Sequence, residues 1–545
     1  MRSFSFLFLL ALAAGLSRST RAQTPTARAP WVPDLGNGHY KNPVLYADYS
    51  DPDVVRVGSD FYLTSSSFNA VPGLQILHSK DLVNWSIIGA VFKAQPPLAR
   101  YREPQHGNGV WAPSIRYHNQ EFYIYYPDPD LGIFVTKAKN PAGPWSVPVC
   151  VKEASGWIDP CPLWDADGKA YLVHGFAGSR AGIKTILAVS PMSADGQRLT
   201  GDDVLVFDGH QGHPTLEGPK FYKRNGYYYI FAPAGGVPTG WQLVLRSKSV
   251  YGPYEEKIVM DQGKTPINGP HQGAWVDTDA GEDWFLHFQD QGAYGRVVHL
   301  QPMVWKNDWP VIGEDPDGDG KGQPVLTYRK PRIKSPAQPL ATPPTSDEFN
   351  RPTLGLQWQW HANRQDYWAY LNPAQGYLRL YSVPLPEGYK NLWQVPSLLL
   401  QKLPAEVFTA TTKLTFTPRV EGEKVGLLIM GLDYAYLSLT NQGGKLQFSQ
   451  TVCKNADKLT AETTSAPVEV PAALAGKPLY LRVAMKAGAK CQFSYSLDGQ
   501  TFQPLGTEFT AREGKWIGAK VGLFCSRTAR FNDAGSADVD WFRID

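Results

Sequence analysis

The sequence predicts an all-β protein, in which a five-bladed β-propeller is followed by a β-sandwich. Three observations lead to this prediction. A strand-like aromatic run recurs five times, helical periodicity is essentially absent, and a period-two alternation of apolar and polar residues begins after Asp347. At 545 residues the chain is also longer than one hydrophobic core usually serves, so two domains are expected.

The aromatic runs mark the predicted blades. Each run follows a turn-like segment, such as Asp165–Gly168 or Lys223–Gly226, of the kind that joins neighbouring antiparallel strands. The runs are about 50–60 residues apart, which suits propeller blades built from several short strands. We therefore assign residues 33–328 to the propeller, with the repeats centred on Tyr62, Tyr123, Tyr171, Tyr229 and Phe285.

A second position of the repeat is acidic in three of the five copies. Eleven or twelve residues before each aromatic centre stand, in chain order, Asp51, Trp111, Asp159, Glu217 and Gly273. Equivalent positions of a radial fold surround one axis. The sequence thus predicts that three carboxylates and a tryptophan face one another across a central cavity.

Each of the three acids is followed by proline within two residues, in Asp51-Pro52, Asp159-Pro160 and Glu217-Gly218-Pro219. Proline fixes the backbone and removes a donor where a strand begins, which would aim the preceding carboxylate at the axis. Any one of these motifs alone is better explained as turn punctuation. Because all three motifs occur at the same position of the repeat, a functional site is the better explanation.

Converging carboxylates are the groups that cleavage of a glycosidic bond requires. One carboxyl must hold a proton for the leaving oxygen, while another must be ionised to activate water. A third carboxylate nearby raises the proton affinity of the acid by like-charge repulsion. Trp111 offers an apolar wall for a sugar ring, although packing in the core explains it equally well.

A proline-rich basic stretch, residues 329–346, is interpreted as the linker between the domains. Residues 347–545 follow, and segments such as Tyr377–Tyr381 and Leu481–Met485 alternate as half-buried antiparallel strands do. About 200 residues of this pattern predict a β-sandwich. Its tryptophans Trp358, Trp360 and Trp368 favour core packing over a sugar-binding platform.

The first 22 residues have the layout of a secretory signal peptide. A basic start is followed by an apolar stretch, Phe4–Leu16, and by Ala22 before an expected cut ahead of Gln23. The segment holds three arginines and no acid, so its removal would leave 50 basic and 50 acidic side chains. We expect a secreted or periplasmic protein that has no membrane partner after signal removal.

Neither the charge nor the cysteines indicate another class of partner. A nucleic-acid-binding surface calls for a basic patch, and the sequence shows none. The five cysteines allow at most two disulfides and do not have the spacing of a zinc site. Burial as small apolar residues explains them at least as well as any bridge.

The motifs around the acids, with Asn42–Leu45 before them and His78–Trp85 after them, resemble glycoside hydrolase family 43. The segment from Glu348 to Trp360 is similar to the start of the concanavalin-like β-sandwich of the family's β-xylosidase-type members. The resemblance covers most of the chain after the signal segment and involves several motifs in the same order. It implies a five-bladed propeller that hydrolyses glycosides with inversion of the anomeric centre.

The resemblance also implies catalytic roles for the three acids. Asp51 would be the general base, Asp159 the residue that orients and tunes the acid, and Glu217 the general acid. No cofactor is required. Ser114 departs from the acid that many members have after Trp-Ala-Pro, a change expected to alter local contacts only.

Three further residues would contact substrate: Trp111, His271 and Arg296. His271 lies in Gly269–Gly273 and matches the family's axial histidine, near which a calcium ion is optional. A lone histidine is more often a hydrogen-bonded core residue than a ligand, so no metal ligand is assigned.

The resulting functional hypothesis is an exported, inverting exo-glycosidase that removes terminal β-D-xylosyl or α-L-arabinofuranosyl residues from plant hemicellulose. Two alternatives remain open. One is an endo-acting arabinanase, and the other is a non-catalytic carbohydrate-binding propeller. The expected partner is an oligo- or polysaccharide.

Overall fold

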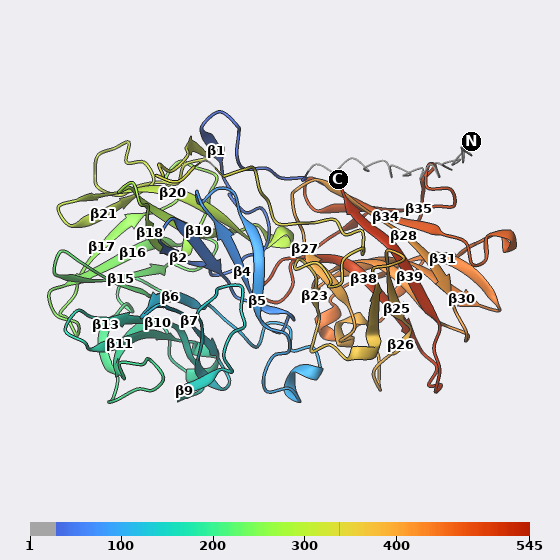
Figure 1. The fold of residues 1–545 in the computed structure, drawn as a ribbon, viewed down its shortest axis with the longest axis horizontal. Helices are drawn as coiled ribbons and strands as arrows, with labels where there is room; N and C mark the ends of the chain where they lie inside the picture. Colours follow the sequence, from blue (N-terminus) through green and yellow to red (C-terminus); the bar gives the residue numbers. More distant parts are fainter. Residues whose placement is uncertain (1–28, 337) are drawn as a thin grey trace, which may run out of the picture.

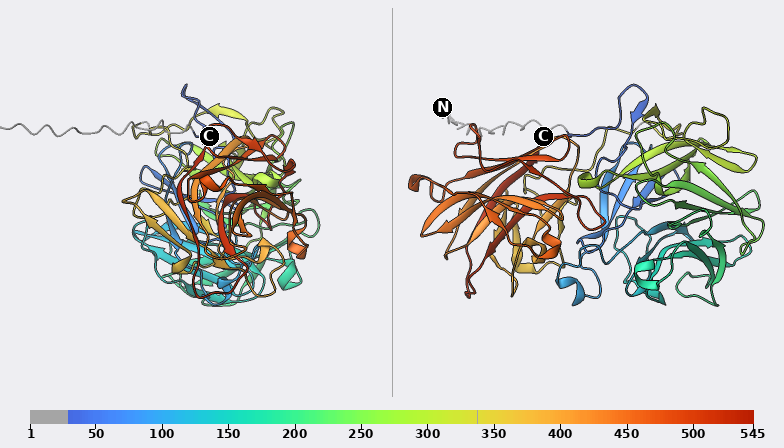
Figure 2. Two further views of the ribbon diagram at one scale, coloured as in Figure 1. Left: turned by 90° about the vertical axis from the view of Figure 1, so that its right-hand side faces the viewer. Right: turned by 180° about the vertical axis from the view of Figure 1, so that it is seen from behind.

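A computed structural model describes residues 29–336 and 338–545 of the chain. Two β-domains lie side by side along the long axis of the molecule (Figure 1, Figure 2). The predicted all-β class is confirmed, because the described residues contain one four-residue α-helix, α1 (Gly178–Ala181), besides short 3-10 turns. None of the described helices is long and apolar enough to span a membrane. The predicted signal segment, residues 1–22, lies outside the described residues.

The first domain is the predicted propeller of five blades, each a four-stranded antiparallel sheet whose strands follow one another along the chain. Blade 1 contains β2 (Asp53–Val57), β3 (Asp60–Thr64), β4 (Gly73–Ser79) and β5 (Ser86–Phe92). Blade 2 contains β6 (Ser114–His118), β7 (Glu121–Asp128), β8 (Gly132–Ala138) and β9 (Val149–Glu153). Blade 3 contains β10 (Trp157–Trp164), β11 (Ala170–Phe176), β12 (Ile186–Met192) and β13 (Val204–Asp208). Blade 4 contains β14 (Lys220–Arg224), β15 (Tyr227–Ala234), β16 (Trp241–Ser247) and β17 (Glu255–Met260), and blade 5 contains β18 (His271–Asp277), β19 (Asp283–Asp290), β20 (Arg296–Lys306) and β21 (Trp309–Ile312).

The aromatic centres of the sequence repeat all lie in the second strand of a blade. Tyr62 in β3 pairs with Val55 in β2, and Phe285 in β19 pairs with Trp275 in β18. Equivalent positions of the sequence repeat therefore occupy equivalent positions in the blades. The positions 11 or 12 residues before each aromatic centre lie just before or within the first strands, which surround the axis.

A separate hydrophobic cluster fills each gap between neighbouring blades. Phe122 and Ile124 of blade 2, for example, pack with Leu74 and Ile76 of blade 1. Corresponding clusters join blades 2 and 3, 3 and 4, and 4 and 5. A fifth cluster joins blade 5 back to blade 1, so the ring is closed by the same apolar burial that holds the other blades together.

The two ends of the propeller segment are also paired with each other. Strand β1 (His39–Lys41) is antiparallel to β22 (Thr327–Arg329), and the two form a sheet of their own. The buried Tyr40 donates its hydroxyl proton to the Leu300 carbonyl at 2.8 Å, which ties this pair to β20.

The stretch predicted to be a linker runs along the propeller. The Lys330 ammonium lies 2.7 Å from a carboxylate oxygen of Asp34 and 2.8 Å from one of Asp81. Arg332 pairs with Glu282 at 2.5 Å. These ion pairs fix the direction in which the chain leaves the propeller.

The second domain is the predicted sandwich of two sheets. One sheet has the order β23-β27-β38-β29-β30-β31-β32, with β26 on β38 and β33 on β31, and its strands are β23 (Gln359–Trp360), β26 (Val383–Pro384), β27 (Leu399–Lys402), β29 (Lys424–Met430), β30 (Tyr434–Gln442), β31 (Lys445–Cys453), β32 (Thr463–Thr464), β33 (Val468–Glu469) and β38 (Lys520–Arg527). The other has the order β24-β25-β39-β28-β34-β35-β36, with β37 on β35, and its strands are β24 (Ala369–Asn372), β25 (Tyr377–Tyr381), β28 (Phe408–Thr417), β34 (Leu479–Lys486), β35 (Lys490–Ser496), β36 (Gln503–Pro504), β37 (Phe509–Thr510) and β39 (Ser536–Ile544).

Three tryptophans near the start of the sandwich belong to its core. Trp358, Trp360 and Trp368 are all buried, so the favoured core role is correct and the alternative of a sugar-binding platform is wrong. All five cysteines lie within the described residues and are unpaired, and four of them are buried.

The domains are joined by backbone hydrogen bonds as well as by side chains. The Val71 N–H donates to the Trp360 carbonyl at 3.1 Å, and the two residues form an isolated antiparallel bridge. Farther along the interface, the Ala519 N–H donates to the Ala293 carbonyl at 2.7 Å. Backbone contacts of this kind set the register of the sandwich on the propeller.

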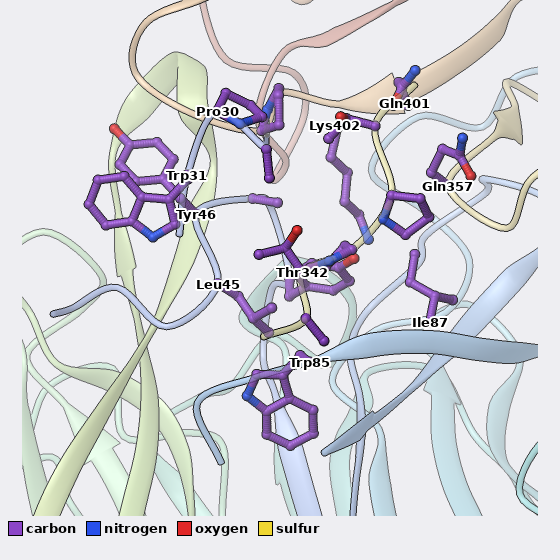
Figure 3. A pocket seen from close by; sticks show the side chains of 18 of the residues that line it. Pro30, Trp31, Leu45, Tyr46, Trp85, Ile87, Thr342, Gln357, Gln401 and Lys402 are labelled. Carbon is purple, nitrogen blue, oxygen red and sulfur yellow. The ribbon is translucent and has the colours of Figure 1, made fainter. Parts of the chain in front are cut away.

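A small cavity of about 50 Å³ lies in the seam between the domains (Figure 3). Trp31, Tyr46 and Trp85 line it together with Lys402 from β27. The Lys402 ammonium donates to the Gln75 side-chain oxygen at 2.7 Å and lies 3.8 Å from the centre of the Tyr49 ring. Burial lowers the pKa of Lys402 to about 7. The cavity has room for a few water molecules and contains none of the three predicted acids.

Buried neutral histidines give the propeller a defined response to acid. His287 in β19 is fully buried, its Nδ1 lies 3.0 Å from the Phe288 carbonyl, and its Nε2 lies 3.0 Å from the amide nitrogen of Gln301. Nδ1 therefore donates and Nε2 accepts, which is the neutral form. Burial lowers the pKa of His287 to about 4.

Because the unfolded imidazole binds a proton near pH 6.5 and the folded one only near pH 4, the folded state loses stability as pH falls through this window. The loss amounts to about 1.4 kcal/mol per pH unit. His287→Gln is expected to reduce the slope of Tm against pH between 6.5 and 4. The exposed His39→Gln serves as the control, and equal slopes in the two variants would contradict the assignment.

Candidate active site

The three predicted acids line one pocket of about 290 Å³ at the axis of the propeller. Asp51 precedes β2, Asp159 lies in β10, and Glu217 precedes β14, so they come from blades 1, 3 and 4. The pocket is also lined by Phe68, Trp111, Ala112, Ile158, Thr215, Val237, Pro238, Gln272, Arg296 and Trp516. The common repeat phase does bring the three carboxyl groups together.

The backbone around two of the acids is in an uncommon conformation. Asp51 has φ 54° and Asp159 has φ 57°, both in the left-handed region. Asp159 also lies at a register irregularity of β10 between Ile158 and Cys161. Bulges and left-handed residues redirect side chains and are frequent beside functional sites, at a cost of about 1–3 kcal/mol each. Both of these acids line the pocket.

Three donors hold the Asp51 carboxylate. Arg296 Nη1 donates to Oδ1 at 3.0 Å, while the hydroxyls of Ser50 and Ser66 donate to Oδ2 at 3.1 and 2.5 Å. The same Arg296 nitrogen donates to the Ser50 hydroxyl oxygen at 2.8 Å. Arg296 and Asp51 are both buried, so this pair is well protected from solvent screening.

A hydrogen bond links the side chain of Asp159 to the backbone next to Glu217. The Gly218 N–H donates to Asp159 Oδ2 at 2.7 Å, which fixes the chain directly after Glu217. Burial raises the pKa of Glu217, and the charges of Asp159 and Asp51 raise it further. Burial also raises the pKa of Asp159, although the Gly218 N–H opposes that shift. The pair therefore retains a proton under conditions in which an exposed carboxyl would lose it.

Trp111 lies in the wall of the pocket, as the aromatic-wall interpretation expected. Its indole N–H donates to the Gly107 carbonyl at 2.7 Å. The Arg180 guanidinium lies 5.2 Å from the ring centre. The ring is therefore held in one orientation beside the acids.

His271 is fully buried at the start of β18, and its Nε2 lies 3.6 Å from Glu217 Oε1. Burial, together with the positive charge of Arg296, lowers the pKa of His271 to about 3, so the imidazole is neutral. Several buried polar atoms in this region have no protein partner, namely both ring nitrogens of His271, Gln272 Oε1 and Arg296 Nε. Buried polar atoms are nearly always paired. Gln272 and Arg296 line the pocket, so their unpaired atoms can receive a polar ligand there, whereas His271 is not among the lining residues and its contact with substrate stays a prediction.

The side chains around His271 do not build a calcium site by themselves. Within the described ranges, no group of three or more His, Cys, Asp or Glu residues is placed to hold a metal ion. Calcium takes six to eight oxygen ligands, and an imidazole is not one of them. Calcium near His271 stays a prediction.

Trp516 is one of several pocket residues that the sequence reasoning missed, and it comes from the other domain. It belongs to the sandwich, lies just before β38, and is about half exposed. Its ring centre lies 6.5 Å from that of Trp111, at an interplanar angle of 67°. The neighbouring Gly518 packs so closely on Gly295 that an added Cβ would come within 2.6 Å of its backbone nitrogen. The segment carrying Trp516 is therefore fixed against the loop that leads to Arg296.

Both domains match families of known proteins. The profile of Glycosyl hydrolases family 43 matches residues 40–310, and that of the Beta xylosidase C-terminal Concanavalin A-like domain matches residues 346–545. A putative beta-xylosidase of Xylanibacter ruminicola is 40% identical over 90% of this chain and 86% of its own length. A non-reducing-end α-L-arabinofuranosidase of Bacteroides ovatus is 29% identical, covering 93% of this chain and 95% of its own. The crystal structure of a family 43 protein from Bacillus licheniformis superposes with a TM-score of 0.79 at 28% identity, covering 93% of this chain and 99% of that one.

Proposed function

The chain belongs to glycosyl hydrolase family 43, and from this membership we propose that it removes single terminal sugars from plant hemicellulose, with inversion of the anomeric centre. The sugars proposed are β-D-xylose and α-L-arabinofuranose. The observation that carries the proposal is the convergence of Asp51, Asp159 and Glu217 on one pocket.

The proposed roles follow from the surroundings of each carboxyl group. Glu217, whose pKa is raised by burial and by its acidic neighbours, donates the proton to the glycosidic oxygen. Asp51, held by Arg296, Ser50 and Ser66, accepts a proton from the attacking water. Asp159 orients the chain after Glu217 through the Gly218 N–H, and its charge helps Glu217 to keep its proton.

Inversion needs a water molecule between the base and the anomeric carbon, on the side opposite the acid. Asp51 and Glu217 enter the pocket from blades 1 and 4, which are not adjacent in the ring. This placement supports a direct displacement by water in the space between them. Asp159 lies on blade 3, next to the blade that carries Glu217, and we assign it the role of orienting and tuning Glu217.

The form of the pocket favours exo over endo action. Its volume of about 290 Å³ lies just below the usual range for ligand sites, which begins near 300 Å³. Trp111 and Trp516 meet edge to face in its wall, and Trp516 comes from the other domain. A linear polymer would need a groove open at both ends, whereas one terminal sugar fits an enclosed site.

The choice between the two sugars rests on relatives of both kinds. The relative from X. ruminicola is named for xyloside cleavage and the one from B. ovatus for arabinofuranoside cleavage. We propose that this chain accepts either sugar. We also propose export, on the basis of the predicted signal segment alone.

Aryl β-D-xyloside and aryl α-L-arabinofuranoside, tested beside linear arabinan, check this function. We expect release of the monosaccharide from at least one aryl glycoside, and proton NMR should detect the inverted anomer first. Release of mixed oligosaccharides from arabinan without monosaccharide would refute exo action. A first product of retained configuration would refute direct displacement by water.

Glu217→Gln removes the proposed acid while keeping the size of the side chain. We expect kcat on a natural xylo-oligosaccharide to fall by about 10²–10⁴-fold, with sugar binding still measurable. Glu153→Gln, at an exposed position in β9, is the matched control. Activity equal to that of the control would mean that another residue is the acid.

Trp516→Ala tests the contribution of the sandwich to the pocket. The variant loses an aromatic wall but no group that transfers a proton, so we expect KM for the aryl glycosides to rise about tenfold with a smaller change in kcat. Phe531→Ala removes an exposed aromatic residue elsewhere on the sandwich and is the control. An unchanged KM would exclude Trp516 from substrate binding.

A further inference from the structure

A second cavity, of about 370 Å³, lies at the end of the propeller axis opposite the active-site pocket. The first strands of all five blades line it, with residues 54–56, 116–118, 162–164, 221–223 and 275–277. The active-site residues Asp51, Trp111 and Glu217, by contrast, stand just before the first strands of their blades. Because equivalent strands run in the same direction around the axis, the two cavities lie at its two ends. We call the second cavity the axial basin.

Hydrogen-bonded side chains cross the axis between the two cavities. Arg116 Nη1 donates to Asp53 Oδ2 at 2.6 Å, and Arg116 Nη2 donates to Cys161 Sγ at 2.9 Å. The Lys220 ammonium donates to the Ser114 hydroxyl at 3.0 Å. These contacts join the first strands of blades 1 to 4, and no described residue lines both cavities. The axial basin is therefore a site of its own and not an extension of the active-site pocket.

Aromatic rings from four blades form much of the wall of the axial basin. Trp164 stacks on His118, with ring centres 4.4 Å apart and an interplanar angle of 8°. The Trp164 indole N–H donates to the Ala194 carbonyl at 2.9 Å, and that of Trp275 donates to the Asp283 carboxylate at 2.7 Å. Both tryptophans are half-buried, so each presents part of its ring to the basin. Rings that are already fixed lose little conformational entropy when a ligand packs on them.

Every charged side chain among the described residues that line the axial basin has an opposite charge as its partner. The pairs are Arg56–Asp277, Arg116–Asp53 and Lys223–Asp165. Burial lowers the pKa of His118, so its ring is neutral near pH 7. An anionic ligand calls for an unpaired cation, and a cationic ligand calls for an unpaired carboxylate. The axial basin therefore suits a ligand without charge.

A neutral sugar fits both the rings and the paired charges. The face of a sugar ring is apolar and packs on an aromatic side chain, while its hydroxyl groups exchange hydrogen bonds with the polar groups around it. An alkyl chain would strip water from the partly exposed Arg56 and Asp277 and offer no hydrogen bond in return. A cavity of about 370 Å³ also lies within the usual range for small-ligand sites, which begins near 300 Å³.

We propose that the axial basin is a second carbohydrate-binding site, which holds a short neutral segment of hemicellulose away from the active-site pocket. This inference rests on the proposed function, because that function supplies the identity of the polymer. Holding the polymer at a second point raises the effective concentration of chain ends near the pocket. The axial basin has no part in the chemical step.

Trp164→Ala removes the larger ring of the stacked pair. We expect KM for a neutral arabinoxylan to rise about tenfold, while kcat/KM for the aryl glycosides stays unchanged, because an aryl glycoside occupies only the active-site pocket. Tyr251→Ala removes an exposed aromatic residue between β16 and β17 and is the matched control. His118→Ala removes the other ring and should raise the same KM. It decides the question if Trp164→Ala does not fold, as judged by Tm.

Binding is measured without turnover by electrophoresis of Glu217→Gln through gels that contain the same arabinoxylan. This protein should be retarded, and adding Trp164→Ala or His118→Ala should remove most of the retardation. A gel that contains polygalacturonate, an anionic polymer, should retard it less than the neutral one does.

The proposal is overturned if the folded basin variants match Tyr251→Ala in their KM for arabinoxylan, or if they lose as much activity on the aryl glycosides. Absence of retardation by arabinoxylan, or stronger retardation by polygalacturonate, would overturn it as well. Failure of the proposed function is distinguishable from these outcomes, because it would leave Glu217→Gln as active as Glu153→Gln whatever the gels show.

Discussion

The arrangement of the whole site depends on closure of the propeller ring. Each blade presents its first strand to the axis, and apolar clusters of the same kind fill every gap, including the gap between blades 5 and 1. A chain position at one phase of the repeat is therefore delivered to the same level of the axis whichever blade carries it. Asp51, Asp159 and Glu217 meet for this reason, although long stretches of chain separate them.

Three carboxyl groups close together repel one another when they are ionised. Each of them has a different set of partners that offsets this repulsion to a different degree. Asp51 receives a guanidinium and two hydroxyls, and Asp159 receives a backbone N–H. Among the described residues, no lysine or arginine forms an ion pair with Glu217, and the neutral imidazole of His271 lies beside it. The differences in partners, rather than the acids themselves, are what separate the chemical roles proposed for them.

The sequence was sufficient for the fold class and for the grouping of the acids, because both follow from a repeat that can be read along the chain. Trp516 could not be found in this way. It lies in the sandwich, outside the repeat, and reaches the pocket only because backbone bonds such as Ala519–Ala293 set the position of one domain on the other. Proline one or two residues after each acid suggested that the carboxylates point inward, but the left-handed conformations of Asp51 and Asp159 depend on three-dimensional packing. Cooperation between domains and backbone strain are long-range properties, and a local pattern does not encode them.

The pairing of β1 with β22 has a consequence for how the chain is made. All five blades consist of strands that follow one another, so each can assemble soon after it leaves the ribosome. Strand β1 is the first of the described strands along the chain, yet its sheet partner is Thr327–Arg329. It must therefore wait for this partner until nearly all of the propeller has been synthesised. Contacts so distant in sequence form slowly, so the pairing of β1 with β22 is expected to be a late step in folding. Until it forms, β1 is accessible to chaperones and proteases.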